Sequence, residues 1–177
     1  MLPEFKNEVF TDFSGPANIA AMEAAFAKVE THLGQQTDLV IGGEHTKTKE
    51  RMLSIDPGKI DRVVGWQSVA TEQDADRAVD AASKAFDSWR RTPPEVRARH
   101  LLKGAAIMRR RKLELAALMV FEVGKSWAEA DGDVAEAIDF LDYYAEGAVQ
   151  LARGKALPQR PGEQNLYRYQ PRGVAAV

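Results

Sequence analysis

Apolar residues recur with helical spacing over most of the chain. The first such run follows Ser14-Gly15-Pro16, a typical helix start because proline is tolerated in the first turn. Its apolar positions are three and four residues apart: Ile19, Met22, Phe26, Val29 and Leu33. This pattern predicts an amphipathic helix that ends at Gly34. Residues 1–36 are therefore expected to form an N-terminal arm and one helix.

Residues 37–70 show short apolar runs separated by turn residues. The runs 38–41, 51–55 and 63–69 have the length of strands, and Asp56-Pro57-Gly58 between the last two is a strong turn signal. We therefore expect a small antiparallel sheet over residues 37–70.

Residues 71–154 return to helical spacing. One helix begins at about Thr71, with an apolar stripe formed by Ala75, Val79, Ala82, Phe86 and Trp89. The next helix begins with Thr92 as its cap and a proline at the first helical position, and residues 113–123 continue as another helix.

The last and longest helix has clear signals at both ends. Gly124 can take the left-handed conformation that closes the preceding helix. Ser126, with Glu129 three residues later, forms a capping box. These signals predict a helix from about Trp127 to Arg153, stopped by Gly154.

Residues 155–177 have strand-like patterns. Residues 165–170 alternate in character, Pro171-Arg-Gly173 forms a turn, and Val174–Val177 begins an apolar strand. The segment is therefore expected to hold a pair of strands after the helices.

Composition narrows the class of protein. The chain has 177 residues, enough to bury a core, and a net charge of -2, which does not favour nucleic acid or an anionic membrane as a partner. No apolar run approaches the length of a membrane span, and Met1–Lys6 does not resemble a secretory signal. A cytoplasmic location is expected. The chain has no cysteine, which excludes disulfides, thiolate metal sites and a cysteine nucleophile within these residues.

One cluster of positive charge needs a separate interpretation. Arg109-Arg-Arg-Lys112 follows the buried face of a predicted helix. A nucleic-acid contact is one interpretation, and it predicts binding that weakens steeply with salt. Cations near the C-terminus of a helix, where the helix dipole favours them, are the simpler interpretation in an acidic chain.

Glu136 is the candidate site residue. On a helix it shares a side with Phe140, Tyr143 and Gly147. A carboxylate in line with aromatic residues is either a solvated edge residue or a charge directed into a pocket, and the pattern alone favours the solvated edge. Phe140 is expected in the core rather than in a pocket wall. Glu122 and Lys125 are expected to have structural roles at a helix end, although both residue types occur in catalysis.

Several motifs together resemble those of the aldehyde dehydrogenase superfamily. They are Glu122-x-Gly-Lys125, the acidic helix that ends in Tyr143-Tyr-Ala145, Gly154-Lys155 and Tyr169-x-Pro-x-Gly-Val174. Two further stretches, Glu8–Phe13 and Glu129–Phe140, resemble the 1-pyrroline-5-carboxylate dehydrogenases, a branch of that superfamily that is also called L-glutamate γ-semialdehyde dehydrogenase. The resemblance extends from about Asn7 to Val177.

The resemblance implies an α/β fold with a doubly wound sheet, of which this chain is the mostly helical N-terminal part. Residues 71–154 would be the helical part of the cofactor domain. Residues 155–177 would be the strand pair of the oligomerisation region, leading into a cofactor sheet that lies beyond Val177. Residues 165–170 would then bridge subunits of a homo-oligomer.

The resemblance also implies the chemistry. In this family a cysteine thiolate attacks the aldehyde, hydride passes to NAD and water releases the acid. The cysteine, the general-base glutamate, the oxyanion-hole asparagine and the NAD contacts all follow the part that this chain matches. We therefore expect no catalytic, cofactor-binding or metal-binding residue here, and no activity from the chain alone. The implied reaction is oxidation of L-glutamate γ-semialdehyde to L-glutamate in proline degradation.

Glu136 takes a specific role under the resemblance. At the matching position the branch has a glutamate near the mouth of the aldehyde pocket, where it would meet the α-ammonium group of the substrate. Two alternatives stay open: an aldehyde dehydrogenase for another aldehyde, and a non-catalytic interaction or oligomerisation module that pairs through its strands.

Overall fold

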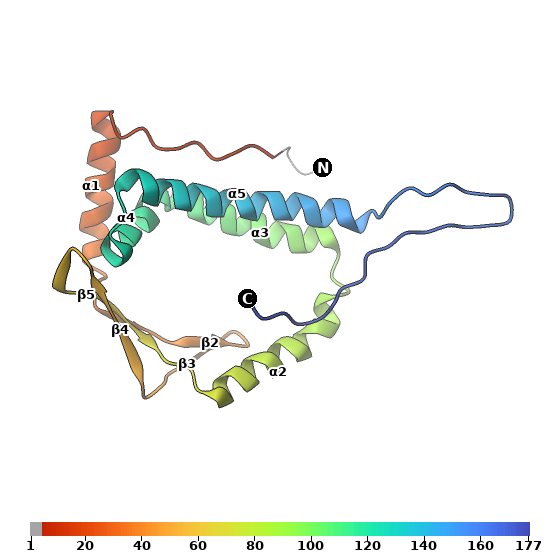
Figure 1. The fold of residues 1–177 in the computed structure, drawn as a ribbon, viewed down its shortest axis with the longest axis horizontal. Helices are drawn as coiled ribbons and strands as arrows, with labels where there is room; N and C mark the ends of the chain where they lie inside the picture. The colour runs from red at the N-terminus through yellow and green to blue at the C-terminus, as the bar shows by residue number, and fades with distance from the viewer. Residues whose placement is uncertain (1–4) are drawn as a thin grey trace.

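The structure is a computed structural model that describes residues 5–177. Residues 1–4 of the expected N-terminal arm lie outside the described part. Figure 1 shows two long helices side by side, a short helix pair at one end of them, and a small sheet and a further helix below. The elements in chain order are α1 (Pro16–Glu30), β1 (Gln35–Thr37), β2 (Leu39–Ile41), β3 (Glu44–Thr46), β4 (Arg51–Asp56), β5 (Lys59–Ser68), α2 (Glu72–Trp89), α3 (Pro94–Arg110), α4 (Lys112–Val123) and α5 (Trp127–Ala152).

The main core lies where α1, α4 and α5 meet one end of α3. Its buried residues are mostly small, so the helix backbones approach closely. They are Met22, Ala25, Ala105, Ala116, Ala117, Ala130, Val134 and Ile138. A second buried cluster, formed by Ala98, Ala145 and Val149, joins the far ends of α3 and α5. These two contacts hold α5 along its length, so its position relative to α3 is fixed at both ends.

An aromatic cluster closes the core beside the start of α5. The ring centroids of Phe26 and Phe121 lie 5.2 Å apart with the rings nearly perpendicular. Trp127 lies 5.6 Å from Phe26 and 5.6 Å from Phe13, measured between ring centroids. Edge-to-face pairs of this kind are favourable beyond the area that they bury. Phe13 therefore anchors the end of the N-terminal segment before α1 begins.

The expected antiparallel sheet over residues 37–70 is two separate units. β4 and β5 pair antiparallel, as expected, but β1 joins β5 in parallel and gives a mixed sheet of order β1-β5-β4. β2 instead forms a hairpin with β3, a strand that the sequence pattern did not predict. The turn of that hairpin contains Gly42 and Gly43, and both have the positive φ that a tight two-residue turn requires. Because the chain turns back there, β2 pairs with β3 and not with a strand of the larger sheet.

Helix ends follow the capping signals, with two corrections. The first helix ends at Glu30 and not at Gly34. Both capping boxes are present, Thr71 with Asp74 and Ser126 with Glu129. Thr92 does not cap α3, whose N-cap is Pro93 and whose first residue is Pro94. The Thr92 hydroxyl donates instead to the Ser88 carbonyl at 3.1 Å, so it satisfies the end of α2.

The helix α2 lies apart from the main core. Of its 18 residues only Asp74 is buried, and the predicted apolar stripe is open, with Val79 55 % and Trp89 47 % exposed. The helix is strongly amphipathic, yet within the described residues its stripe lacks a covering layer. In Figure 1 it lies below the opening that separates it from α3 and α5.

The expected strand pair in residues 155–177 is not formed as strands. All these residues are described, and the strand-like pairing among them is one isolated antiparallel bridge between Lys155 and Tyr167. Gly154, with φ +66°, allows this approach, because a Cβ there would lie 2.0 Å from the Tyr167 carbonyl oxygen. Residues 165–170 have no neighbouring strand among residues 5–177, and an isolated two-stranded ribbon is marginal in water. In Figure 1 the segment extends beyond α5 and returns towards α2.

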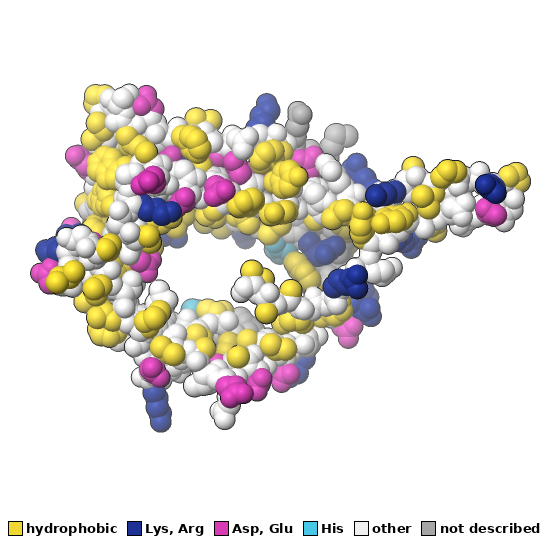
Figure 2. Space-filling model, viewed as in Figure 1, with side chains coloured by type: hydrophobic (Ala, Val, Ile, Leu, Met, Phe, Trp, Pro, Cys, Tyr) yellow, Lys and Arg dark blue, Asp and Glu magenta, His cyan; other side chains and the backbone are white. Residues whose placement is uncertain are grey.

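Figure 2 shows the surface that results from this arrangement. An opening separates the long helices from α2 and the C-terminal segment, and hydrophobic side chains lie on both sides of it. Exposed large apolar residues occur in every layer, including Ile60 (78 % exposed) and Val40 (61 % exposed). Among the described helices, none has the length and apolar character needed to cross a membrane.

Candidate functional site

Glu136 lies on the solvent-facing side of α5, near its middle. The residue is exposed, and its carboxylate takes part in none of the hydrogen bonds or ion pairs among residues 5–177. Tyr143, two turns further along the same side, is 56 % exposed. The structure thus brings Glu136, Phe140 and Tyr143 to one open face, as their spacing predicts.

Phe140 is 49 % exposed, so the expectation that it lies in the core is wrong. Its ring stacks on that of Tyr144, with the centroids 5.8 Å apart and the planes 15° from parallel. Both rings line an apolar groove of about 330 Å³ between α3 and α5. The other lining residues are Leu101, Met108, Ala137 and Leu141. A carboxylate therefore stands next to a groove with aromatic walls, an arrangement suited to a ligand with a short carbon chain and a positive charge.

The start of α5 is fixed by local contacts. Gly124 has φ +73° and closes α4, and its backbone N–H donates to the Val120 carbonyl at 3.0 Å. The Ser126 N–H and hydroxyl both donate to the Glu129 carboxylate, at 3.1 and 2.8 Å. These hydrogen bonds lower the pKa of Glu129, the side-chain bond with Ser126 being the largest cause.

Glu122 and Lys125 have structural partners, as expected. The Ser54 hydroxyl on β4 donates to Glu122 at 3.0 Å, which ties the sheet to the end of α4. Lys125 forms an ion pair with Asp133 across the turn between α4 and α5.

Residues 5–13, here called the N-terminal strap, run along α5 and are held at two anchors. The first anchor is buried. The Thr11 N–H and hydroxyl donate to the two carboxylate oxygens of Asp131, at 2.8 and 2.6 Å. The Lys112 ammonium lies 3.0 Å from the same carboxylate and donates to the Val9 carbonyl at 2.7 Å. The side chain of Asp131 is 1 % exposed and that of Lys112 is 10 % exposed, so each charge depends on the other.

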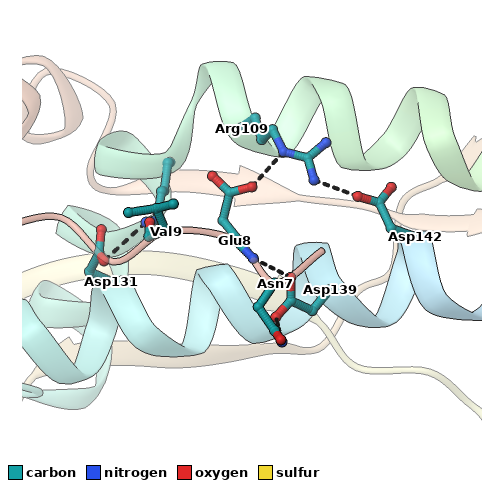
Figure 3. A network of polar contacts seen from close by, with 8 residues as sticks. Asn7, Glu8, Val9, Arg109, Asp131, Asp139 and Asp142 are labelled. Carbon is teal, nitrogen blue, oxygen red and sulfur yellow. Dashed lines mark hydrogen bonds and ion pairs between the residues drawn. The ribbon is translucent and has the colours of Figure 1, made fainter. Parts of the chain in front are cut away.

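The second anchor lies nearer the surface (Figure 3). Asp139 accepts a hydrogen bond from the Glu8 N–H at 2.7 Å and another from the Asn7 amide at 2.8 Å. Arg109 reaches from α3 between two carboxylates, donating to Glu8 through Nε at 2.5 Å and to Asp142 through its terminal nitrogen. These contacts raise the pKa of the Arg109 guanidinium above its ordinary value, the hydrogen bond to Asp142 being the largest cause.

The strap explains most of the basic run Arg109–Lys112. Arg109 and Lys112 hold the strap, and Arg111 pairs with Glu114 at 3.1 Å. Three of its four cations are therefore neutralised within the protein. Arg109 and Arg110 lie in the last turn of α3, as the dipole interpretation expects, but Lys112 begins α4. The carboxylates that the cations contact belong to the strap, α4 and α5.

Sequence reasoning missed Asp131, although a signal was present. Asp131, Val134, Ala135 and Ile138 fall at i, i+3, i+4 and i+7, the spacing of one buried helix face. An aspartate at an apolar position of such a face needs a buried partner, and Lys112 supplies it. The two stretches that carry the closest family resemblance, 8–13 and 129–140, are thus the two sides of one contact.

Glu136, the apolar groove and the N-terminal strap together are suited to binding a ligand rather than to catalysing a reaction. Among residues 5–177 no group of three or more His, Asp or Glu side chains is arranged to hold a metal ion. The chain holds no cysteine. Glu136 and the groove supply a charge and an apolar wall, and the strap supplies rigidity.

The comparisons with known proteins identify the fold and the family. A family model described as "Aldehyde dehydrogenase family" matches residues 44–177. The 1-pyrroline-5-carboxylate dehydrogenase of Bacillus pumilus is 51 % identical over the whole chain, and 1-pyrroline-5-carboxylate dehydrogenase 2 of Bacillus subtilis is 47 % identical. The chain spans about a third (34 %) of the length of each of these relatives.

Solved structures agree with this result. The 1-pyrroline-5-carboxylate dehydrogenase from Thermus, crystallised with bound NAD, is 44 % identical and superposes with a TM-score of 0.85 over 89 % of this chain and 31 % of its own. The Mycobacterium tuberculosis enzyme bound with NAD and cobalamin is 26 % identical, with a TM-score of 0.81 over 90 % of this chain and 30 % of its own. The fold is therefore the N-terminal part of the aldehyde dehydrogenase fold, and the chain belongs to the aldehyde dehydrogenase family.

Proposed function

We propose that this chain is the N-terminal third of an NAD-dependent 1-pyrroline-5-carboxylate dehydrogenase. The longer protein that would contain it is called the full-length parent below. The parent oxidises L-glutamate γ-semialdehyde, the open form of 1-pyrroline-5-carboxylate, to L-glutamate in proline degradation. The observation that carries this proposal is the 51 % identity to the Bacillus pumilus enzyme over all 177 residues. The NAD in the Thermus structure supports the choice of cofactor.

The four parts expected from the sequence keep their roles under this proposal. Residues 71–154 form the helical part of the cofactor domain, and residues 155–177 lead into its sheet and take part in oligomerisation. In a homo-oligomer of the parent, residues 165–170 gain the neighbouring strand that they lack among the described residues. The parent acts in the cytoplasm.

Glu136 selects the substrate by charge. Glutamate γ-semialdehyde carries an α-ammonium group on a short carbon chain, and Glu136 presents a carboxylate beside the apolar groove of Phe140 and Tyr144. A charged hydrogen bond of this kind contributes about 1.5–3 kcal/mol. The apolar groove accommodates the methylene groups of the semialdehyde.

The isolated chain is inactive because it lacks the sulfur nucleophile. In the reaction the thiolate adds to the aldehyde carbon, hydride leaves that carbon for NAD, and water displaces the thiolate to give the acid, NADH and a proton. With zero cysteines in the 177 residues, the first bond cannot form. Residues 1–177 supplied with NAD and the semialdehyde should give no NADH absorbance, and steady NADH production by this chain would refute the assignment of roles.

The substrate assignment is tested in the full-length parent with two aldehydes. The second is 5-oxopentanoate, which has the same chain and carboxylate but no ammonium group. We expect Glu136→Gln to lower the ratio of kcat/KM for the semialdehyde to that for 5-oxopentanoate by about tenfold. An unchanged ratio would reject the role of Glu136. A parent that prefers 5-oxopentanoate before mutation would favour the alternative of another aldehyde.

A further inference from the structure

The angular spacing of residues around α5 separates three strips. Glu136 lies on the central strip, with Phe140 and Tyr144 on one side of it and Asp139 and Asp142 on the other. With 3.6 residues per turn, each residue is about 100° from the next. Phe140 and Tyr144 then lie about 40° and 80° to one side of Glu136, where they line the groove. Asp139 and Asp142 lie about 60° and 120° to the other side, where they hold the N-terminal strap.

The strap also reaches the central strip. The ring of Phe5 packs edge-on against that of Tyr143, with the centroids 5.5 Å apart. Tyr143 is about 20° from Glu136 around the helix axis, two turns along. Glu136 is thus bordered by the groove on one side and by strap contacts on the other.

Arg109 links all three segments at this point. Its guanidinium joins Glu8 of the strap to Asp142 of α5, while its backbone belongs to the last turn of α3. A planar guanidinium with two separate donors suits this bridging geometry, which a single ammonium would not reproduce. The bridge lies on the side of α5 away from the groove, so it acts on the strap rather than on the groove walls.

From these contacts we infer that the strap is a positioning device for substrate selection. Glu8, Arg109 and Asp142 are positioning residues: they fix the strap against α5, so that Phe5 stays packed on Tyr143 at the border of Glu136. This inference rests on the proposed function of Glu136. The strap itself is independent of that proposal, because its contacts lie within this chain.

The strap is tested first by amide hydrogen exchange on the 177-residue chain. The Glu8 N–H, bound to Asp139, and the Thr11 N–H, bound to Asp131, are both expected to be protected. Asp142→Asn keeps the side-chain shape but weakens the Arg109 bridge, so the amide of residue 8 should exchange at least about threefold faster. The amide of Thr11, which has its own buried anchor, should be unchanged and serves as the internal control.

The effect on selection is measured in the full-length parent. Glu8→Gln and Asp142→Asn are each expected to lower the kcat/KM ratio of semialdehyde to 5-oxopentanoate by about threefold to tenfold, through KM for the semialdehyde. The kcat for 5-oxopentanoate should stay unchanged. The matched control is Asp87→Asn, which removes the same kind of charge from an exposed ion pair with Arg90 on α2.

The outcomes separate the two proposals. A lowered ratio in Glu136→Gln with an unchanged ratio in Glu8→Gln and Asp142→Asn would overturn the strap's role and leave the proposed function standing. An equal loss with both aldehydes would also overturn it, because that result indicates general destabilisation. An unchanged ratio in Glu136→Gln rejects the proposed function, and the strap is then judged by amide exchange. Rapid exchange at residue 8 in the unmodified chain would overturn the strap.

Discussion

The Asp131 carboxylate, itself on α5, connects the N-terminal strap and α4. It accepts hydrogen bonds from the backbone and hydroxyl of Thr11 and lies against the Lys112 ammonium, with its side chain 1 % exposed. A buried carboxylate in such a position is stabilised only as long as all its partners stay in place. Removing this carboxylate is therefore expected to lower the free energy of unfolding strongly, through the loss of this one anchor.

We predict that Asp131→Ala lowers the free energy of unfolding of the chain by roughly 3–5 kcal/mol, because the Lys112 ammonium is left buried without its counter-charge. The measurement is urea unfolding followed by circular dichroism. The control, Asp87→Ala, breaks the exposed Asp87–Arg90 pair and should cost less than about 0.5 kcal/mol. Equal losses in the two variants would contradict the role of Asp131.

A second prediction concerns Gly124. An alanine there would adopt φ near +73° and place its Cβ 3.0 Å from the Pro57 ring, so Gly124→Ala should cost at least about 1–2 kcal/mol of unfolding free energy. Gly132→Ala is the matched control, because this helical position has open space around its Cβ. That variant should gain roughly 0.5–1 kcal/mol. Urea unfolding measures both, and a gain in both variants would contradict the prediction.

Residue types with local signals were predictable from the sequence, and those with distant partners were not. Ser126 with Glu129 and the turn glycine Gly124 act within a few residues of themselves, so spacing alone located them. Arg109 was assigned to a helix end, but its carboxylates are 101 residues before it and 33 residues after it. No periodicity contains that information.

Among the elements, α2 depends most on its own ends, since its apolar stripe is open. The capping box at its start lowers the pKa of Asp74 to about 2, the backbone hydrogen bond with Thr71 being the largest cause and the Thr71 hydroxyl and Arg77 adding to it. The ordinary value is 3.8. A depressed carboxyl pKa means that the ionised form stabilises the fold, and this contribution is complete above the unfolded value.

We therefore predict that the contribution of Asp74 is lost as the pH falls from about 4 to about 2, with α2 losing helicity first. Circular dichroism between pH 5 and pH 2 measures this. Asp74→Asn should remove that part of the pH dependence. Glu72→Gln, in the same first turn but exposed, should leave it in place. Identical acid transitions in the unmodified chain and Asp74→Asn would refute the prediction.

The helices were predictable because each carries its pattern within itself, whereas the strands depend on neighbours. The stretch 165–170 alternates as a strand does, yet in the described part of the chain only Tyr167 of this stretch has a bridge partner. The runs near residues 39 and 63 were recognised as strands, but the hairpin partner of the first and the parallel neighbour of the second were not. Choosing between a parallel neighbour and a hairpin requires knowledge of turns such as Gly42-Gly43, whose geometry was not evident from the pattern.

At the scale of the whole molecule, large apolar side chains remain at the surface in several layers. Val9, Ile60 and Tyr144 are 81 %, 78 % and 59 % exposed. Large apolar side chains exposed to this degree are typical of surfaces that another part of a protein covers. Under the proposed function, the remaining two thirds of the parent cover much of it.

We predict that the 177-residue chain binds an apolar fluorescent dye strongly and that the full-length parent binds far less per mole. Dye titration at equal molar concentration gives the comparison, with heat-unfolded chain as the upper reference. Weak dye binding by a monomeric chain with a sharp thermal transition would instead favour the stand-alone interaction module.

The strap has a further consequence for the order of events during synthesis. The Glu8 N–H bonds to a residue 131 positions later in the chain. At typical translation speeds of about 5–20 residues per second, roughly 7–25 seconds pass between the emergence of these two partners from the ribosome. Until Asp131 emerges, the strap has none of its hydrogen bonds to α5. The segment that is made first is thus without these contacts while nascent-chain enzymes and chaperones can meet it.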